Sequence, residues 1–304
     1  MPGEILYWLI NMSIVASFMG LIVMAVRKIR SIPHRVSVFL WMIPFIRMCI
    51  PWGINSPYSL MSLVSRLTTR TVTVYRPTDD LAFSTTNVLM KADSYSPLTF
   101  SSEDLQHVFD IAFWIWAAVA LAILITIGVL YFTTKKEIKD SILYKDDIYL
   151  SEKVDSPAVY GIFGHRIVLP ASLAGTDLKY IIGHERTHVR RHDNLWRLLG
   201  FITAAIHWFN PLSWIFLRAF LAELELACDE TAVSGYDAQE RKDYARALLN
   251  ASQSRNLFVS AFGGAKVRTR IENVLSYKKI TVFSAIGFSI FVLAVLYVLM
   301  TNAG

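Results

Sequence analysis

The sequence is poor in charged residues and in cysteine. Asp, Glu, Lys and Arg make up 18% of its 304 residues, against about 25% in an ordinary soluble domain, which argues against a cytosolic enzyme and a disordered tail. Its two cysteines, Cys49 and Cys228, lie far apart, so they provide neither a disulfide framework nor a cysteine-based zinc finger. Apolar residues are in excess at 54%, and they gather in runs long enough to cross a bilayer.

Four of these apolar runs predict transmembrane helices, since a crossing of the hydrocarbon core takes about 20 residues. The predicted spans are 5–26, 36–52, 108–132 and 280–300. The second span contains one charge, Arg47, close enough to an end to serve as an interfacial anchor. No basic region precedes the first run, so we do not interpret it as a cleavable signal peptide.

The basic residues predict the orientation of the spans. Segment 27–35 holds four bases and no acid, whereas segment 53–107 holds four bases and five acids. Lysines also follow the third span and precede the fourth. Because Lys and Arg are enriched in cytoplasmic loops, we expect 53–107, the N-terminus and the tail 301–304 outside and 133–279 inside. The net charge of +6 is thus a topology signal, and direct contact with nucleic acid is not expected.

The chain therefore divides into three predicted parts. Residues 1–132 hold three transmembrane helices and an extracellular loop, residues 133–279 form a cytoplasmic domain, and residues 280–304 hold the fourth helix and a short extracellular tail. In the cytoplasmic part, strand-like runs such as 159–170 precede helical periodicity from Leu178 onward. We predict an α-helical membrane protein with four transmembrane helices and a cytoplasmic α+β domain.

One motif indicates a catalytic metal: Gly-His-Glu-Arg-Thr-His at 183–188. Residues four apart on a helix share a face, so His184 and His188 can bind one ion, and imidazole suits zinc. Glu185, one step round the helix, can take a proton from zinc-bound water that attacks a peptide carbonyl. The alternative is a surface helix with two solvated histidines, but such a match arises by chance in roughly one chain in a hundred. A fourth ligand would close the water position, so His192 is interpreted as solvated or supporting.

A second helical segment, 222–230, offers the third ligand that a catalytic zinc requires. The spacing of Glu225 and Asp229 puts two carboxylates on one face. We predict Glu225 as the ligand and Asp229 as the acceptor of a hydrogen bond from a ligand histidine. Glu223 and Glu230 are interpreted as solvated, and Cys228 as a small buried thiol rather than a ligand.

The apolar run 195–220 between the two motifs is almost long enough for another span. A single crossing would leave His188 and Glu225 on opposite sides of the membrane, unable to share a metal. The run must therefore be a buried helix pair or a hairpin, with a turn at Asn210-Pro211. We interpret it as a helix–turn–helix that lies against, or partly in, the inner leaflet.

Together these residues resemble the BlaR/MecR family of integral-membrane zinc metallopeptidases, which are β-lactam sensor-transducers and their relatives. The shared elements are His184-Glu185-x-x-His188, Arg191-x-Asp193, Asn210-Pro211-Leu212, Glu225-x-x-x-Asp229, Ser156-Pro157, Phe262-Gly-Gly and Arg268-x-Arg270-Ile271. The resemblance covers nearly the whole chain, although the Glu-x-x-x-Asp element is also similar to HtpX-type membrane proteases.

The resemblance implies a multi-pass protein of the bacterial cell membrane whose gluzincin-type domain holds one catalytic zinc. It implies a metalloendopeptidase of a signal-transduction system, activated by an external signal such as a β-lactam. It also implies autocleavage before the last span and control of a repressor of antibiotic-resistance genes. The residues onto which the cleavage segment maps are Ser260, Ala261, Phe262, Arg268 and Arg270.

The expected partners are membrane lipid and a protein substrate, a cytoplasmic repressor, while a homodimer is left open. Sensor members of the family continue after the fourth span into an extracellular penicillin-binding domain. Because the sequence stops at Gly304, we expect either a truncated or a sensorless relative.

Two other functions stay open: an HtpX-like quality-control protease, and a non-proteolytic transducer with a structural zinc. A site-2-type intramembrane protease fits poorly, because charged residues surround the zinc motif. These residues are Arg186, Arg190, Arg191 and Asp193.

Overall fold

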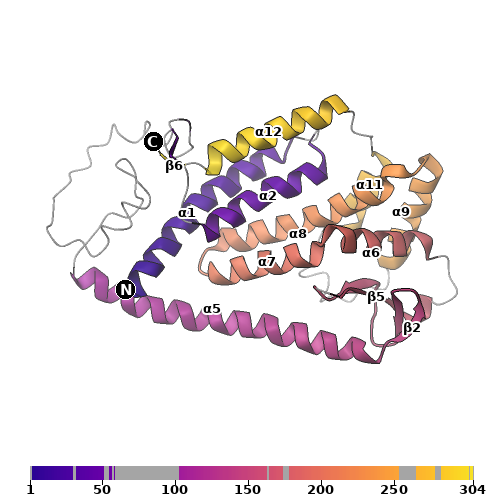
Figure 1. Cartoon of the computed structure of the whole chain (residues 1–304), viewed down its shortest axis with the longest axis horizontal. Helices are drawn as coiled ribbons and strands as arrows, with labels where there is room; N and C mark the ends of the chain where they lie inside the picture. The colour runs from indigo at the N-terminus through magenta and orange to yellow at the C-terminus, as the bar shows by residue number, and fades with distance from the viewer. Residues whose placement is uncertain are drawn as a thin grey trace.

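The computed structural model describes residues 2–29, 32–50, 55–56, 58, 103–162, 164–173, 178–252, 265–277, 282–300 and 302–303. Helices dominate this part of the chain (Figure 1). Their bounds are α1 Pro2–Val26, α2 His34–Cys49, α5 Glu103–Glu137, α6 Lys179–Arg191, α7 Asp193–Ile206, α8 Pro211–Ala232, α9 Ala238–Ser252, α11 Val267–Leu275 and α12 Val282–Met300. The strands are β1 Asn55–Ser56, β2 Ile142–Lys145, β3 Ile148–Ser151, β4 Ala158–Tyr160, β5 Arg166–Pro170 and β6 Asn302–Ala303.

A helix covers most of each predicted span. By length and composition, two helices in the described ranges can cross a membrane: Pro2–Val26 and the apolar run His107–Asp140. By contrast, α2 has only 16 residues, with Pro44 inside it, and α12 has 19. Four crossings and their orientation therefore stay predictions, and the predicted loop 53–107 lies almost entirely outside the described residues.

The largest apolar core joins α1, α2 and α8. Aromatic rings from α2 and α8 pack in tilted pairs along it, with Trp41 5.8 Å from Phe216 and Phe45 5.4 Å from Phe220 between ring centroids. Helix α1 approaches α8 closely at Gly20, where an added Cβ would lie 2.2 Å from the Phe216 ring. The helix that carries Glu225 is thus packed directly against the first two apolar helices.

Helices α7 and α8 form the hairpin expected from the sequence, and Asn210 caps α8 by accepting a hydrogen bond from the Leu212 amide. The turn of the hairpin contacts both α1 and α2. At its turn, Nε2 of His207 lies 3.2 Å from the Met48 carbonyl oxygen, at the end of α2 opposite the basic segment 27–35. The Asn210 amide also donates to Ser13 Oγ at 2.8 Å. The turn of the hairpin therefore packs against α1 and α2, and the placement of the pair against, or partly in, the inner leaflet stays a prediction.

The small sheet has strand order β2-β3-β5-β4, with β3 and β5 parallel and the other pairs antiparallel. Strand β5 is central, and Ile167 and Leu169 pack with Ile181 and Val189 of α6. Strands thus precede helices in the α+β order expected from the sequence. Strand β4 forms one edge of this sheet and contacts the motif helix α6.

Candidate metal centre

Two helices bring the predicted zinc ligands together. His184 and His188 project from α6 and Glu225 from α8, and all three are buried. The two histidine Nε2 atoms lie 3.1 Å apart, and the Glu225 oxygens lie 3.8 Å from Nε2 of His184 and 3.7 Å from Nε2 of His188. Ligands at about 2.1 Å from a tetrahedral zinc are about 3.4 Å from one another. The three groups therefore have close to the spacing that one zinc ion requires.

The other nitrogen of each ring is held by a partner. Nδ1 of His188 lies 2.6 Å from a carboxylate oxygen of Asp193, and Nδ1 of His184 lies 2.9 Å from the Tyr244 hydroxyl. That hydroxyl donates to Asp229 at 2.7 Å, and Asp229 itself lies 3.3 Å from Nδ1 of His184. With a proton on each Nδ1, both Nε2 lone pairs face the shared point, which is the tautomer that a metal needs.

Sequence reasoning missed Asp193 and Tyr244 as supporting residues. Helix α6 ends at Arg191, and His192 adopts a left-handed conformation with φ 54°. That turn folds Asp193 back beneath His188 and leaves His192 exposed, as one of its two predicted roles required. Tyr244 comes from α9, and no local spacing links it to the motif.

Two guanidinium groups form ion pairs with the Glu225 carboxylate. Arg197 donates to one carboxylate oxygen, and Nη1 of Arg270 lies 3.2 Å from the other. Burial alone would raise the pKa of Glu225, but Arg270 and Arg197 hold that pKa well below its usual range. Glu225 is therefore ionised at neutral pH, as a zinc ligand must be.

Arg270 reaches the centre from α11 and is itself 4% exposed. It donates to both oxygens of Asp229, from Nε at 2.7 Å and from Nη2 at 2.9 Å. The same Nη2 lies 3.1 Å from Nε2 of His184. A metal-bound Nε2 has no lone pair left for an N–H donor, so metal binding requires this contact to open, whereas the pair with Asp229 can remain.

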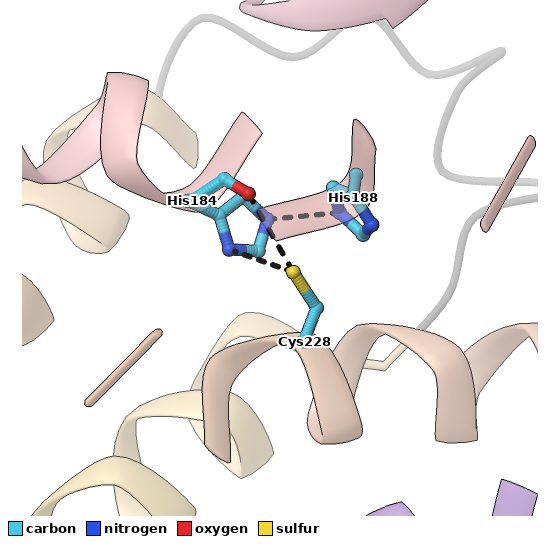
Figure 2. Close-up of side chains that lie close together, drawn as sticks. All are labelled: His184, His188 and Cys228. Carbon is cyan, nitrogen blue, oxygen red and sulfur yellow. Dashed lines mark hydrogen bonds between the residues drawn. The ribbon is translucent and has the colours of Figure 1, made fainter. Parts of the chain in front are cut away.

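Cys228 lies closer to the centre than expected. It is fully buried, and its Sγ is 3.6 Å from Nδ1 of His184. Figure 2 shows Cys228 pointing from α8 toward the two rings on α6, and one ligand atom from each of the three residues lies within 4.8 Å of the others. Because thiolate is a good zinc ligand, Cys228 competes with Glu225 for the third position.

Glu185 lies beside the ligands on α6 and is buried. It lines a cavity of about 40 Å³ together with His184, Tyr244, Arg270 and the segment Ser156–Pro157, which is room for a water molecule. Strand β4 contacts helix α6, and burial, with the carboxylates of Glu137 and Glu185, raises the pKa of Tyr160 on that strand. The edge strand β4 therefore runs beside the predicted general base.

The interpretation of Glu223 and Glu230 as solvated side chains is wrong for Glu223, which is buried, whereas Glu230 is half-buried and bound to backbone amides. Glu223 is 4% exposed and pairs with Arg27 at 2.7 Å and with Nδ1 of His34 at 2.5 Å. Glu230 accepts hydrogen bonds from the backbone amides of His34 at 3.1 Å and Arg35 at 3.2 Å. The basic segment that links α1 to α2 contains no acid, and α8 supplies its counter-charges. The metal helix is thereby fixed to the first two apolar helices.

The residues of the predicted cleavage segment fall into two groups. Ser260, Ala261 and Phe262 lie outside the described residues. Arg268 and Arg270 lie in helix α11, where Arg268 is exposed and pairs with Glu272 at 2.8 Å. Autocleavage stays a prediction, and Arg270 gains a role in the centre itself.

Comparison with known proteins gives the family. The family model described as BlaR1 peptidase M56 matches residues 7–274. The Methicillin resistance mecR1 protein of Staphylococcus aureus is 31% identical over 115 residues, which is 36% of this chain and 20% of that protein. The Regulatory protein BlaR1 of Bacillus licheniformis is 24% identical over 161 residues, 49% of this chain and 26% of that protein. The Regulatory protein BlaR1 of Staphylococcus aureus is 26% identical over 144 residues, which is 43% of this chain and 25% of that protein.

These aligned regions are between 20% and 26% of the relatives' own length. The family match, however, extends from α1 through the metal centre to α11. The resemblance found in the sequence is thereby confirmed, and the chain belongs to the membrane-associated BlaR1 peptidase M56 family.

Proposed function

We propose that this chain is a zinc metalloendopeptidase of a membrane signalling system that hydrolyses peptide bonds on the cytoplasmic side. The observation that carries the proposal is the convergence of two Nε2 atoms and one carboxylate at 3.1–3.8 Å. Glu185 faces a water-sized cavity beside them. The fold family implies the metal, and the donor set suits it.

His184, His188 and Glu225 would hold the zinc, which supplies activation of water and polarisation of the scissile carbonyl. The Glu185 carboxylate accepts the proton of the attacking water and delivers it to the leaving amine. Asp193 keeps His188 in the required tautomer by accepting its Nδ1 proton.

We propose that the substrate backbone pairs with β4. In the described part of the sheet, β4 pairs with β5 on one side and has no partner strand on the other. Addition of an extended peptide to an exposed edge is a common mode of recognition. Strand β5 is not available for this pairing, because it lies between β3 and β4.

A regulatory substrate is favoured over quality control, because relatives bear the names Regulatory protein BlaR1 and Methicillin resistance mecR1 protein. We propose a cytoplasmic repressor and the chain's own segment 260–270 as substrates, cleaved in response to an external signal such as a β-lactam. Proteomics of cells with the wild type and with Glu185→Gln tests this. One or a few cleaved proteins support regulation, whereas many support an HtpX-like role.

The third ligand is tested by two variants on α8. Wild type should contain about one zinc per chain, Cys228→Ser should keep it, and Glu225→Gln should weaken zinc binding by more than about 100-fold. Zinc content by mass spectrometry and affinity by chelator competition measure both effects. Thermal unfolding separates metal loss from misfolding, since Glu225 also pairs with Arg197 and Arg270. Zinc loss in Cys228→Ser with retention in Glu225→Gln would reverse the assignment.

The orientation is tested with single cysteines. In a Cys49→Ser background, Lys91→Cys should react in intact cells with a membrane-impermeant thiol reagent, and Lys139→Cys should react only after lysis. Cys228 is buried and should stay unlabelled while the protein is folded. Labelling of position 139 in intact cells would contradict the cytoplasmic placement of the peptidase domain.

A further inference from the structure

Two adjoining cavities separate the second half of α5 from α7. The first has a volume of about 730 Å³ and is lined by residues 118–130 of α5, by Phe201 and by Trp214. The second, of about 840 Å³, lies toward the end of α5 and reaches the β4–β5 hairpin. Ile127 and Phe201 line both, so the two form one groove along α5, which runs below α7 toward the strands (Figure 1).

We propose that this groove binds one anionic phospholipid, with its acyl chains between α5 and α7 and its phosphate among the cations at the end of α5. The proposal rests on the orientation proposed above, in which the end of α5 is cytoplasmic. It does not depend on peptidase activity.

The charges that line the second cavity are all of one sign. Its cationic lining residues are Lys135, Lys136, Lys139 and Arg166. No carboxylate is among the described residues that line it, and none of the three lysines has an ion pair within the described part of the chain. Basic pockets between membrane helices on the cytoplasmic side bind anionic lipid headgroups. The charge therefore matches a phosphate.

The first cavity supplies the matching apolar half. Its lining is apolar except for Thr126, whose hydroxyl already donates to the Ala122 carbonyl oxygen at 2.8 Å within α5. Just before the first lining residues of α5, Trp116 donates to the Ile206 carbonyl oxygen of α7 at 2.7 Å, so the two helices are in contact there. The apolar part of the groove lies inside the predicted span, and the cations lie at the cytoplasmic end of that span. A phospholipid has the same arrangement, with its acyl chains in the membrane and its headgroup at the surface. A soluble peptide or a free anion would match only one half.

The groove lies next to the edge strand β4, so a lipid bound in it would contact that strand. Val159, Tyr160 and Gly161 line the second cavity, and Val159 and Tyr160 belong to the edge strand β4. Asn194 of α7 donates to the carbonyl oxygens of Val159 at 2.9 Å and Gly161 at 3.1 Å. A lipid in the groove would therefore rest against the strand on which we propose the substrate binds.

The test is a lipid titration of the purified full chain in detergent, followed by native mass spectrometry. Wild type should bind one phosphatidylglycerol more tightly than phosphatidylethanolamine. Lys135→Gln/Lys139→Gln should weaken phosphatidylglycerol binding by about 30-fold. The control Lys145→Gln/Lys242→Gln removes the same charge from exposed positions outside the groove and should bind as wild type does.

Two further arms separate the sources of the signal. Ala122→Phe narrows the apolar half without a change in charge and should also weaken phosphatidylglycerol binding. Inorganic phosphate at millimolar concentration should not displace the lipid. Equal binding of the two lipids, equal loss in both lysine pairs, or displacement by phosphate would each overturn the proposal. Zinc content and peptide hydrolysis are measured separately, so such a failure would leave the proposed function standing.

Discussion

Glu185→Gln is expected to lower the rate of peptide hydrolysis by about 10²–10⁴-fold and to leave the metal bound. The reason is a separation of roles between neighbours on α6. Glu185 lines the cavity in which a water can sit, whereas the groups that converge on the metal position are His184, His188 and a side chain of α8. A carboxamide of the same shape preserves packing but cannot take a proton from water.

Wild type and Glu185→Gln are compared in zinc content, in hydrolysis of a labelled protein and in fragments that end between residues 260 and 270. Glu152→Gln is the matched control, because Glu152 is exposed. It should retain full activity. The same fragments in both proteins would identify a contaminating protease. Loss of zinc in Glu185→Gln would mean that Glu185 has a structural role in the centre.

The parts of the centre that were predictable from the sequence depend on local geometry. His184 and His188 are one helical turn apart, as are Glu225 and Asp229, so each pair must share a face. The turn at Asn210-Pro211 follows in the same way from capping preferences. Periodicity and turn chemistry suffice for such features.

The features that could not be predicted depend on contacts across the fold. Glu223 can be buried because its carboxylate pairs with Arg27. The two residues are 196 positions apart in the sequence, so the pairing is visible only in the folded chain. Strand β5 inserts between β3 and β4, so its position inside the sheet cannot be read from its own residues. The sequence assigns Arg270 to the predicted cleavage segment, but α11 carries it into the centre against Asp229. Only tertiary packing determines these three.

The pair of Arg270 and Asp229 leads to the second large expected effect. Asp229 is fully buried, and although burial would raise its pKa, Arg270 holds that pKa well below its usual range. Asp229→Asn therefore leaves a buried guanidinium with Glu225 as its remaining carboxylate partner. Removal of one partner of a buried pair costs about 3–5 kcal/mol when the other charge is left unpaired, so with Glu225 still in contact the loss of stability should be up to about that size. Loss of support for His184 should weaken metal binding by about 10–100-fold.

A double-mutant cycle distinguishes the buried pair from an ordinary one. Thermal unfolding and zinc affinity are measured for Asp229→Asn, for Arg270→Gln and for the double variant. The double variant should be more stable than the sum of the single losses predicts, because it buries no unpaired charge. Asp243→Asn is the control, since Asp243 and Arg246 form a more exposed pair at 3.2 Å and such pairs contribute under about 1 kcal/mol. Equal, small losses in Asp229→Asn and Asp243→Asn would show that α11 is not anchored to the metal helix through this pair. A large loss that the double variant partly recovers would show that the helix leading to α12 is fastened at the metal centre itself.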